Sequence, residues 1–262
     1  MVNKQKSLHR PITHNEYTFM SEAAKKVGII TKIKKEITHN DYKINEVNAN
    51  NRGFYKSVQE NFLVLATAKY LAPYILGGVF LFLGVAFLTT ILTVEADTSD
   101  PETGITIATV VFFLGFLFFL GYGFTMPPKD CIYNRLKSTV TFPGFMWHKN
   151  ITMHISVLEF YYTAPSAQGI GAYMLTIIRP DKMFSSYLMS TGRKYDKDIS
   201  FFLWYMDKNR PLPPGEALDK YRDNDFKRRK AEGFPKPIFP SLVETPEFTP
   251  EQQAERLMIG GW

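Results

Sequence analysis

The chain has 262 residues, with 31 Lys and Arg against 25 Asp and Glu, and a formal charge of +6. Its length allows one or two domains. A hydrophobic content of 45% excludes a wholly disordered chain, and two long uncharged runs exclude an ordinary soluble protein.

These two runs predict a pair of membrane-spanning helices, Leu71–Val94 and Ile105–Met126. At about 1.5 Å per residue they are about 36 Å and about 33 Å long, enough for a hydrocarbon core of about 30 Å. Neither run contains a charged residue, which argues against a transport path through them. Small residues that would let the two helices approach closely are Gly77, Gly78, Gly84, Gly115, Gly121 and Gly123.

The distribution of charge predicts how the pair is oriented. The loop Glu95–Gly104 is acidic, and all 31 Lys and Arg residues lie in the flanking segments. Because basic residues favour the cytoplasmic side, we expect both termini in the cytoplasm and residues 95–104 outside. The single cysteine, Cys131, cannot form an intrachain disulfide, which agrees with a cytoplasmic location of most of the chain.

The composition of residues 1–69 predicts a polar, basic arm, and this arm contains a repeat. ITHNEY at Ile12–Tyr17 recurs as ITHNDY at Ile37–Tyr42. In each copy Thr precedes an acidic residue by three positions, the spacing of a helix capping box. The alternative interpretation is a docking peptide used twice, and both interpretations stay open. Phe54–Ala68 mixes apolar and polar residues, which indicates an amphipathic lead-in to the first span.

A lysine cluster in this arm predicts contact with anionic lipid head groups, which attract basic residues near a membrane surface. Motifs of nucleic-acid-binding proteins are absent from the sequence, so nucleic acid is not expected as a partner. The candidate lipid-facing residues are Lys25, Lys26, Lys32, Lys34 and Lys35.

Residues 129–209 predict a small β-rich domain. Polar and apolar residues alternate along Cys131–Phe142, as in a half-buried strand. Asp198–Asp207 has apolar residues at helical spacing and follows the strands as one amphipathic helix. Further predicted strands are Phe145–Trp147, Ile151–Tyr162, Ala172–Ile178 and Met183–Met189.

The fold class is therefore an α+β membrane protein, with a two-helix hairpin before the β-rich domain. Short strands closed by one helix resemble a pleckstrin-homology-like (PH-like) barrel, and YNRLKSTVTFP at Tyr133–Pro143 resembles the opening of such domains in bacterial membrane proteins. A β-rich domain of another topology stays open. Lys129–Trp262 is expected to fold without the spans.

Residues 210–262 predict a helical, proline-rich tail. A charged helix over Glu216–Glu232 ends before Gly233 at a C-cap, and Thr249–Glu251 starts a short last helix. Lys227–Lys230 (KRRK) is interpreted as a solvated helix face. Large apolar side chains between the prolines make the tail a candidate binding surface. The candidate partner-binding residues are Phe234, Ile238, Phe239, Phe248 and Trp262.

The tail also carries a resemblance. Arg210–Arg256, with the preceding FFLWYMD, resembles uncharacterised two-span inner-membrane proteins of Gram-negative bacteria, some of them encoded beside type VI secretion effectors. The similarity covers roughly residues 70–262. It implies a bacterial inner-membrane location with residues 95–104 in the periplasm.

A catalytic constellation is not evident in the sequence, so we expect a protein that is not an enzyme and uses no cofactor. Cys131 has no neighbouring His, and His148 and His154 lack further zinc ligands. Two functions remain: an immunity or accessory protein for a type VI secretion toxin, or a membrane-tethered PH-like scaffold that binds lipid head groups or a cytoplasmic protein. The partner's identity and a homo-oligomeric state stay open.

Overall fold

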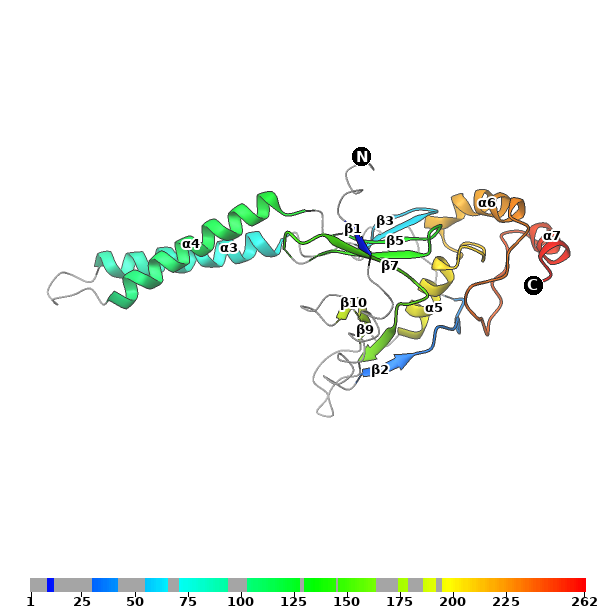
Figure 1. The fold of residues 1–262 in the computed structure, drawn as a ribbon, viewed down its shortest axis with the longest axis horizontal. Helices are drawn as coiled ribbons and strands as arrows, with labels where there is room; N and C mark the ends of the chain where they lie inside the picture. The colour runs from blue at the N-terminus through cyan, green and yellow to red at the C-terminus, as the bar shows by residue number, and fades with distance from the viewer. Residues whose placement is uncertain are drawn as a thin grey trace. The chain divides into compact units, whose positions relative to one another are not determined.

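The structure is a computed structural model that describes residues 9–11, 30–41, 55–65, 71–93, 103–127, 130–144, 146–163, 174–178, 186–191 and 195–262. It is an α+β protein with two apolar helices and a downstream sheet domain (Figure 1). The chain divides into two compact units, a helical unit of residues 67–129 and 144–148 and a sheet unit formed by the rest.

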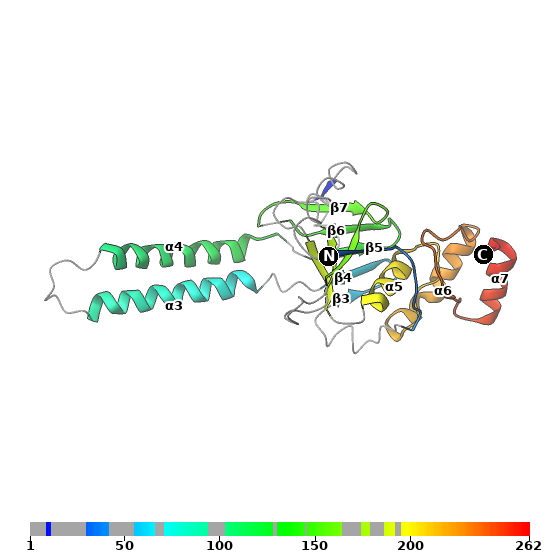
Figure 2. The same cartoon turned by 90° about the horizontal axis from the view of Figure 1, so that it is seen from below.

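The helical unit contains α3 (Ala72–Thr93) and α4 (Thr103–Thr125), which lie side by side in Figures 1 and 2. The two predicted helices are thus confirmed, and both are long and apolar enough to cross a membrane. At one end of the pair, the Trp147 ring lies 4.9 Å from the Tyr122 ring, and its indole N–H donates to Thr125 Oγ1 at 3.0 Å.

Glycines set the spacing between α3 and α4. Cβ atoms at Gly77 and Gly84 would lie 3.5 Å from the Cβ atoms of Phe119 and Phe112, respectively. A Cβ atom at Gly115 would overlap the Phe80 ring. The predicted close approach is confirmed at these glycines and at Gly123, which faces Tyr74, whereas Cβ atoms at Gly78 and Gly121 would meet no heavy atom within 4 Å.

Gly115→Val should therefore separate the two helices. A disulfide between Cys at positions 77 and 119, placed in a Cys131→Ala chain, reports their contact because the Cβ distance of 3.5 Å suits a disulfide. We expect Gly115→Val to reduce the disulfide yield several-fold, since the Phe80 ring must move out of its packing against Phe112. Gly121→Val is the matched control, and an equal loss there would contradict the argument.

The first sheet of the sheet unit contains β4 (Phe62–Leu65) beside β5 (Cys131–Asn134), with Leu65 opposite Cys131. Both helices α3 and α4 are thus inserted between two neighbouring, antiparallel strands. The strand order is β1-β7-β6-β5-β4-β3, where the other members are β1 (His9–Pro11), β3 (Tyr55–Val58), β6 (Thr139–Phe142) and β7 (Asn150–His154).

The amphipathic lead-in predicted over Phe54–Ala68 is wrong, because this segment contains the hairpin β3–β4. Leu63 and Leu65 are buried, whereas Phe62 is exposed and Val64 is half-buried. This burial has the period of two that a strand produces, and a helix would not alternate in this way. The arm of residues 1–69 therefore supplies strands to the sheet unit.

The second sheet has the order β10-β9-β8-β2, and all its pairs are antiparallel. Two long predicted strands are each divided. Cys131–Phe142 turns at Arg135–Ser138, where Asn134 Oδ1 accepts the Lys137 N–H at 3.0 Å, and Ile151–Tyr162 turns between β7 and β8. Residues 146–148 form a turn and not a strand. The members are β2 (Ile30–Ile33), β8 (Phe160–Thr163), β9 (Met174–Ile178) and β10 (Ser186–Thr191).

Helix α5 (Tyr195–Met206) joins the two sheets in one core. The Phe202 ring lies 4.6 Å from that of Tyr133 on β5 and 5.5 Å from that of Phe160 on β8. Trp204 is buried and donates its indole N–H to the Pro211 carbonyl at 2.7 Å. The sequence predicted this helix correctly.

Two further helices follow α5 and are placed as the sequence predicts. Helix α6 (Glu216–Ala231) is followed by Gly233 at φ 74°, a left-handed conformation that favours glycine. Helix α7 (Pro250–Gly260) is capped by Thr249, whose side chain accepts the Gln252 N–H. Both helices lie in the C-terminal tail, which also forms a cleft.

Candidate functional site: a cleft in the C-terminal tail

A cleft of about 820 Å³ lies between the extended segment Lys236–Pro246 and helix α7. Its two sides are both partly apolar: Ile238 is exposed on the first and Leu257 on the second. Two arginines, Arg210 and Arg256, also line it. A volume of this size is within the range of ligand pockets, and the mixture of guanidinium and apolar groups suits a peptide or side chain of mixed character.

Asp207, just after α5, fixes the first side of the cleft. Its Oδ2 accepts the backbone N–H groups of Ile238 at 2.9 Å and Phe239 at 3.2 Å. Asn209 donates its side-chain N–H to the Lys236 carbonyl at 2.6 Å. The extended segment is therefore held by side chains from the end of α5, together with the bridge between Ser241 and Ile37.

The two arginines brace the cleft from within. Arg210 donates to Thr245 Oγ1 at 2.8 Å and to the Phe239 carbonyl at 2.7 Å. Arg256 donates to the Thr245 carbonyl at 3.0 Å, and its guanidinium carbon lies 4.4 Å from the centre of the Trp262 ring. Such stacking on an indole is a favourable cation–π geometry. Arg256 thus joins α7 to the extended segment, whereas Arg210 links two parts of that segment.

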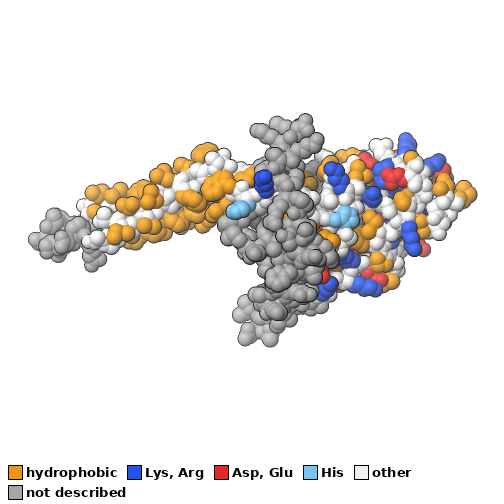
Figure 3. All heavy atoms as spheres, viewed as in Figure 1, with side chains coloured by type: hydrophobic (Ala, Val, Ile, Leu, Met, Phe, Trp, Pro, Cys, Tyr) orange, Lys and Arg blue, Asp and Glu red, His pale blue; other side chains and the backbone are white. Residues whose placement is uncertain are grey.

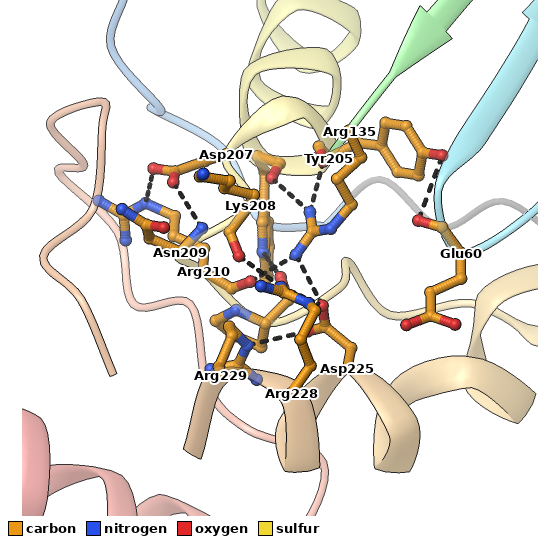
Figure 4. A network of polar contacts seen from close by, with 12 residues as sticks. Glu60, Arg135, Tyr205, Asp207, Lys208, Asn209, Arg210, Asp225, Arg228 and Arg229 are labelled. Carbon is orange, nitrogen blue, oxygen red and sulfur yellow. Dashed lines mark hydrogen bonds and ion pairs between the residues drawn. The ribbon is translucent and has the colours of Figure 1, made fainter. Parts of the chain in front are cut away.

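A buried ionic network joins the β5–β6 turn and the end of α5 to α6 (Figure 4). The Asp225 carboxylate on α6 accepts from Arg135 at 3.2 Å, Arg228 at 2.8 Å and Arg229 at 2.9 Å. Arg135, at the β5–β6 turn, also donates to the Tyr205 and Arg210 carbonyls. The network therefore fastens the C-terminal end of α5, where helix carbonyls lack helical partners, to α6.

The network continues from α6 to the cleft through Glu247. Arg229 forms a bidentate pair with this carboxylate, with distances of 2.7 Å and 2.6 Å, and Arg256 reaches it at 3.4 Å. Arg229 and Glu247 are both buried. A bidentate guanidinium–carboxylate pair fixes orientation as well as distance, so the position of α7 depends on residues of α6.

The two buried aspartates respond to their surroundings in opposite directions. Burial alone would raise the pKa of Asp225, but Arg135, Arg229 and Arg228 outweigh it and hold that pKa below its usual range. Burial raises the pKa of Asp207 despite its hydrogen bond from the Phe239 N–H and the charge of Arg210. Asp225 is thus the more strongly stabilised anion.

The structure divides the predicted partner-binding residues into two groups. Phe234 and Phe239 are 1% and 5% exposed, and Phe239 is among the residues that line the cleft, so their role in binding stays a prediction. Ile238 and Phe248 are exposed, and Trp262 is half-buried with its indole N–H donating to the Phe234 carbonyl at 2.8 Å. Of these three residues, Ile238 and Trp262 line the cleft and Phe248 does not.

Sequence reasoning missed Arg210, Arg256 and Leu257 as residues of the cleft. It also interpreted Lys227–Lys230 as a solvated face, whereas Arg229 is fully buried there. The signal was present in the spacing: Asp225 and Arg229 are four residues apart, a separation at which helical side chains meet. Their common partner Glu247 is distant in sequence, so no local pattern indicates it.

The lysines predicted to face lipid have protein partners where the structure describes them. Lys32 pairs with Glu159 at 2.6 Å, Lys34 pairs with Glu36 at 3.0 Å, and the Lys35 ammonium donates to the Ile155 and Ser156 carbonyls. Lys25 and Lys26 lie outside the described residues. Of the predicted cluster, Lys35 is therefore better explained as a link between the arm and the β7–β8 turn.

Lys35 should be unusually reactive towards amine-acylating reagents. Burial lowers its pKa to about 8, although Glu159 acts in the opposite direction. At pH 8 about half of the Lys35 side chains should therefore be neutral and nucleophilic. Competitive acylation followed by mass spectrometry should show Lys35 modified faster than the exposed Lys34, with the difference disappearing in the unfolded chain. Equal rates in the folded protein would contradict this prediction.

The lowered pKa of Lys35 also makes the stability of the folded protein depend on pH. The folded pKa lies below the unfolded value, so the unfolded chain binds more protons between about pH 8 and about pH 10.5. Stability from this group should therefore rise with pH across that window. The same rise should be absent from a Lys35→Met chain.

Comparison of the chain with protein-family models, with curated proteins and with solved structures found no match. Among the residues that the structure describes, groups of three or more His, Cys, Asp or Glu side chains that could hold a metal ion are also absent. The geometry of the cleft and the two apolar helices are therefore the basis for a functional proposal.

Proposed function

We propose that this is a membrane-anchored binding protein without catalytic activity, which recognises a protein partner through the C-terminal cleft. The observation that carries the proposal is the cleft itself, which is lined by the exposed side chains of Ile238 and Leu257 and by two arginines. Interfaces are enriched in arginine and large apolar side chains. The residues of the cleft are held by buried ion pairs, so the surface is preorganised for binding.

The exposure of the two helices supports anchoring in a membrane. Phe82, Leu92 and Phe124 are each more than 70% exposed, and hydrophobic side chains cover most of the visible face of α3 and α4 in Figure 3. Exposed apolar surface on this scale is unfavourable in water. Trp147, Tyr122 and Tyr74 lie at one end of the pair, as aromatic residues do at a membrane interface.

The proposed location is the bacterial inner membrane, with both termini cytoplasmic and residues 95–104 periplasmic. The absence of Lys and Arg from the loop supports this orientation. The proposed fold of the sheet unit is PH-like: β4–β7 form one antiparallel run, β8–β10 form a second, and α5 packs against both. A PH-like domain would account for this topology if the membrane hairpin is inserted between β4 and β5, the first two strands of the first run.

The partner we propose is a type VI secretion toxin, for which this protein would be an immunity or accessory protein. The resemblance of Arg210–Arg256 to inner-membrane proteins encoded beside such effectors motivates this choice, and most of the residues that line the cleft lie within that range. A scaffold that binds a cytoplasmic protein is the alternative. Lipid head groups fit the described lysines less well, because Lys32 and Lys34 are paired with carboxylates.

Two matched leucines test the proposal. Leu257 lines the cleft, whereas Leu242 is exposed outside it. In a strain that lacks the gene, plasmid-borne wild-type protein should restore survival against a type VI-armed sibling. Leu257→Asp should reduce that survival at least about tenfold, because a charge in the cleft excludes an apolar anchor, and Leu242→Asp should not.

The same strains separate the two functions. If the deletion strain competes normally with its armed parent, the immunity function is wrong. A pulldown in mild detergent with wild-type, Leu257→Asp and Leu242→Asp proteins then identifies a cytoplasmic partner that only the Leu257 variant loses. If both variants retain the same partners, the cleft is not the recognition surface.

A further inference from the structure

The second copy of the repeated hexapeptide occupies a defined site in the sheet unit. We call this site, formed by Lys197 and Ser200 of α5 and Pro240–Glu244 of the tail, the repeat seat. Ile37 is fully buried there, with its N–H donating to the Pro240 carbonyl at 3.0 Å and its carbonyl accepting the Leu242 N–H at 2.9 Å.

Every other described residue of this copy also contacts the repeat seat. Ser200 Oγ accepts the backbone N–H groups of Thr38 at 3.1 Å and His39 at 3.3 Å, and it lies 3.2 Å from Thr38 Oγ1. Asn40 donates to the Glu244 carbonyl at 3.2 Å, and Asp41 pairs with Lys197. The described residues 38–41 are not helical, so a capping box does not form there.

The first copy contains the same chemistry in the same order. Ile12, Thr13, His14 and Asn15 repeat the four residues that contact the seat first, and Glu16 keeps a carboxylate for Lys197 with one more methylene of reach. The side chains that the seat recognises are therefore all present twice in one chain.

We propose that the repeat seat is a sequence-selective peptide site whose second occupant is Ile12–Tyr17 of the same chain, which exchanges with Ile37–Tyr42. The two copies are offset by 25 residues, so each is tethered to the same seat. Tethering by a short linker gives a millimolar effective concentration, which exceeds that of a second molecule in most conditions. Only one copy fits at a time.

The exchange would change the cleft as well as the arm. Pro240, Ser241 and Glu244 line the cleft and also border the seat. The segment that holds them loses its pairing to Ile37 when the second copy leaves and regains an equivalent pairing only when Ile12 enters. A peptide that carries the sequence I-T-H-N followed by an acidic residue would act on the cleft in the same way.

Disulfide trapping in the full-length Cys131→Ala chain tests the proposal. Thr38→Cys with Ser200→Cys should cross-link, because the two hydroxyls lie 3.2 Å apart. The test pair is Thr13→Cys with Ser200→Cys, and Thr18→Cys with Ser200→Cys is the control for tethering alone. We expect an intrachain cross-link for Thr13→Cys that clearly exceeds the control.

Weakening the second copy should favour the first. Adding Ile37→Ala to the test pair should raise its intrachain cross-link about tenfold or more, as expected when the ratio of two occupants shifts by 1.4 kcal/mol or more. Adding Ile12→Ala should abolish it. If the Ile37→Ala chain folds poorly, the yields of Thr13→Cys and Thr18→Cys, each paired with Ser200→Cys in a chain that keeps Ile37, still test the proposal.

Two results would overturn the proposal. A Thr13→Cys yield no higher than that of Thr18→Cys would show that the first copy does not enter the seat. A cross-link found only between two chains would show that the seat takes this peptide from a second molecule and not from its own.

Discussion

Replacing Asp225 with asparagine should lower the melting temperature of the purified full-length protein by about 10 °C. Asp225 is fully buried and balances Arg135, Arg228 and Arg229. Removing one partner of a buried ion pair costs about 3–5 kcal/mol, and each kcal/mol shifts the melting temperature of a domain of about 150–250 residues by about 2–4 °C. The amide keeps the shape, so the change isolates the charge.

Asp223→Asn is the matched control, because Asp223 is exposed on the same helix. Its carboxylate accepts a hydrogen bond from the Gln252 side chain at 3.0 Å. Its melting temperature should stay within about 2 °C of the wild type. The pKa of Asp225 is depressed, so its stabilisation should be present above the unfolded pKa of about 3.9 and disappear as pH falls through the folded pKa. A difference between wild type and Asp225→Asn that does not begin to shrink as pH falls below about 3.9 would contradict this account.

Removing the two apolar helices should leave a soluble, cooperatively folded sheet unit. Leu65 and Cys131 lie opposite each other on β4 and β5, so residues 66–130 can be replaced by Asn-Gly, a turn suited to a two-residue hairpin. The shortened chain should be monodisperse without detergent and should melt in one transition. The loss of the Lys56–Asp130 pair is a small effect, because Lys56 is exposed.

The fragment Lys129–Trp262 is the informative comparison. The sequence predicted that it folds alone, but it lacks β4, which covers β5, and Ile37, which is fully buried in the core. We expect it to be insoluble or to show no cooperative transition, because an uncovered strand edge promotes association. A fragment that melts as sharply as the shortened chain would show that residues 30–65 are dispensable.

The same structural reasoning changes what a tail truncation can reveal. Loss of Phe234–Trp262 would remove Glu247, the bidentate partner of buried Arg229, together with the buried Phe234 and Phe239. Such a chain would lose stability together with the cleft, so a loss of function would not separate the two effects. Point changes such as Leu257→Asp therefore test function more directly than truncation.

Sequence patterns predicted the features that depend on local interactions. The two long apolar helices follow from uncharged runs, α5 follows from its apolar spacing, and α6 and α7 follow from Gly233 and Thr249 at their ends. Each of these signals lies within a few residues of the structure that it specifies. The α+β class followed from the same elements.

The remaining features depend on residues that are far apart in sequence. β4 and β5 pair across the whole helical unit, Arg229 pairs with Glu247 beyond the end of its own helix, and Ile37 packs beside Ser241. One sequence gives no indication of such pairings. The cleft was missed for the same reason, because its sides come from a proline-rich segment and from α7.

The position of the helical unit between β4 and β5 has a consequence for biosynthesis. Strand β4 is translated before both apolar helices, whereas its neighbour β5 is translated after them. Their pairing must wait until α3 and α4 have left the ribosome. Since α3 and α4 pack antiparallel through Gly77, Gly84 and Gly115, their association would return the chain to the end of the pair at which it entered and shorten the search of β5 for β4. If the pair spans a membrane as proposed, its insertion would be the step that permits the sheet unit to close, and a chain that fails to insert would expose an unpaired strand edge to proteases.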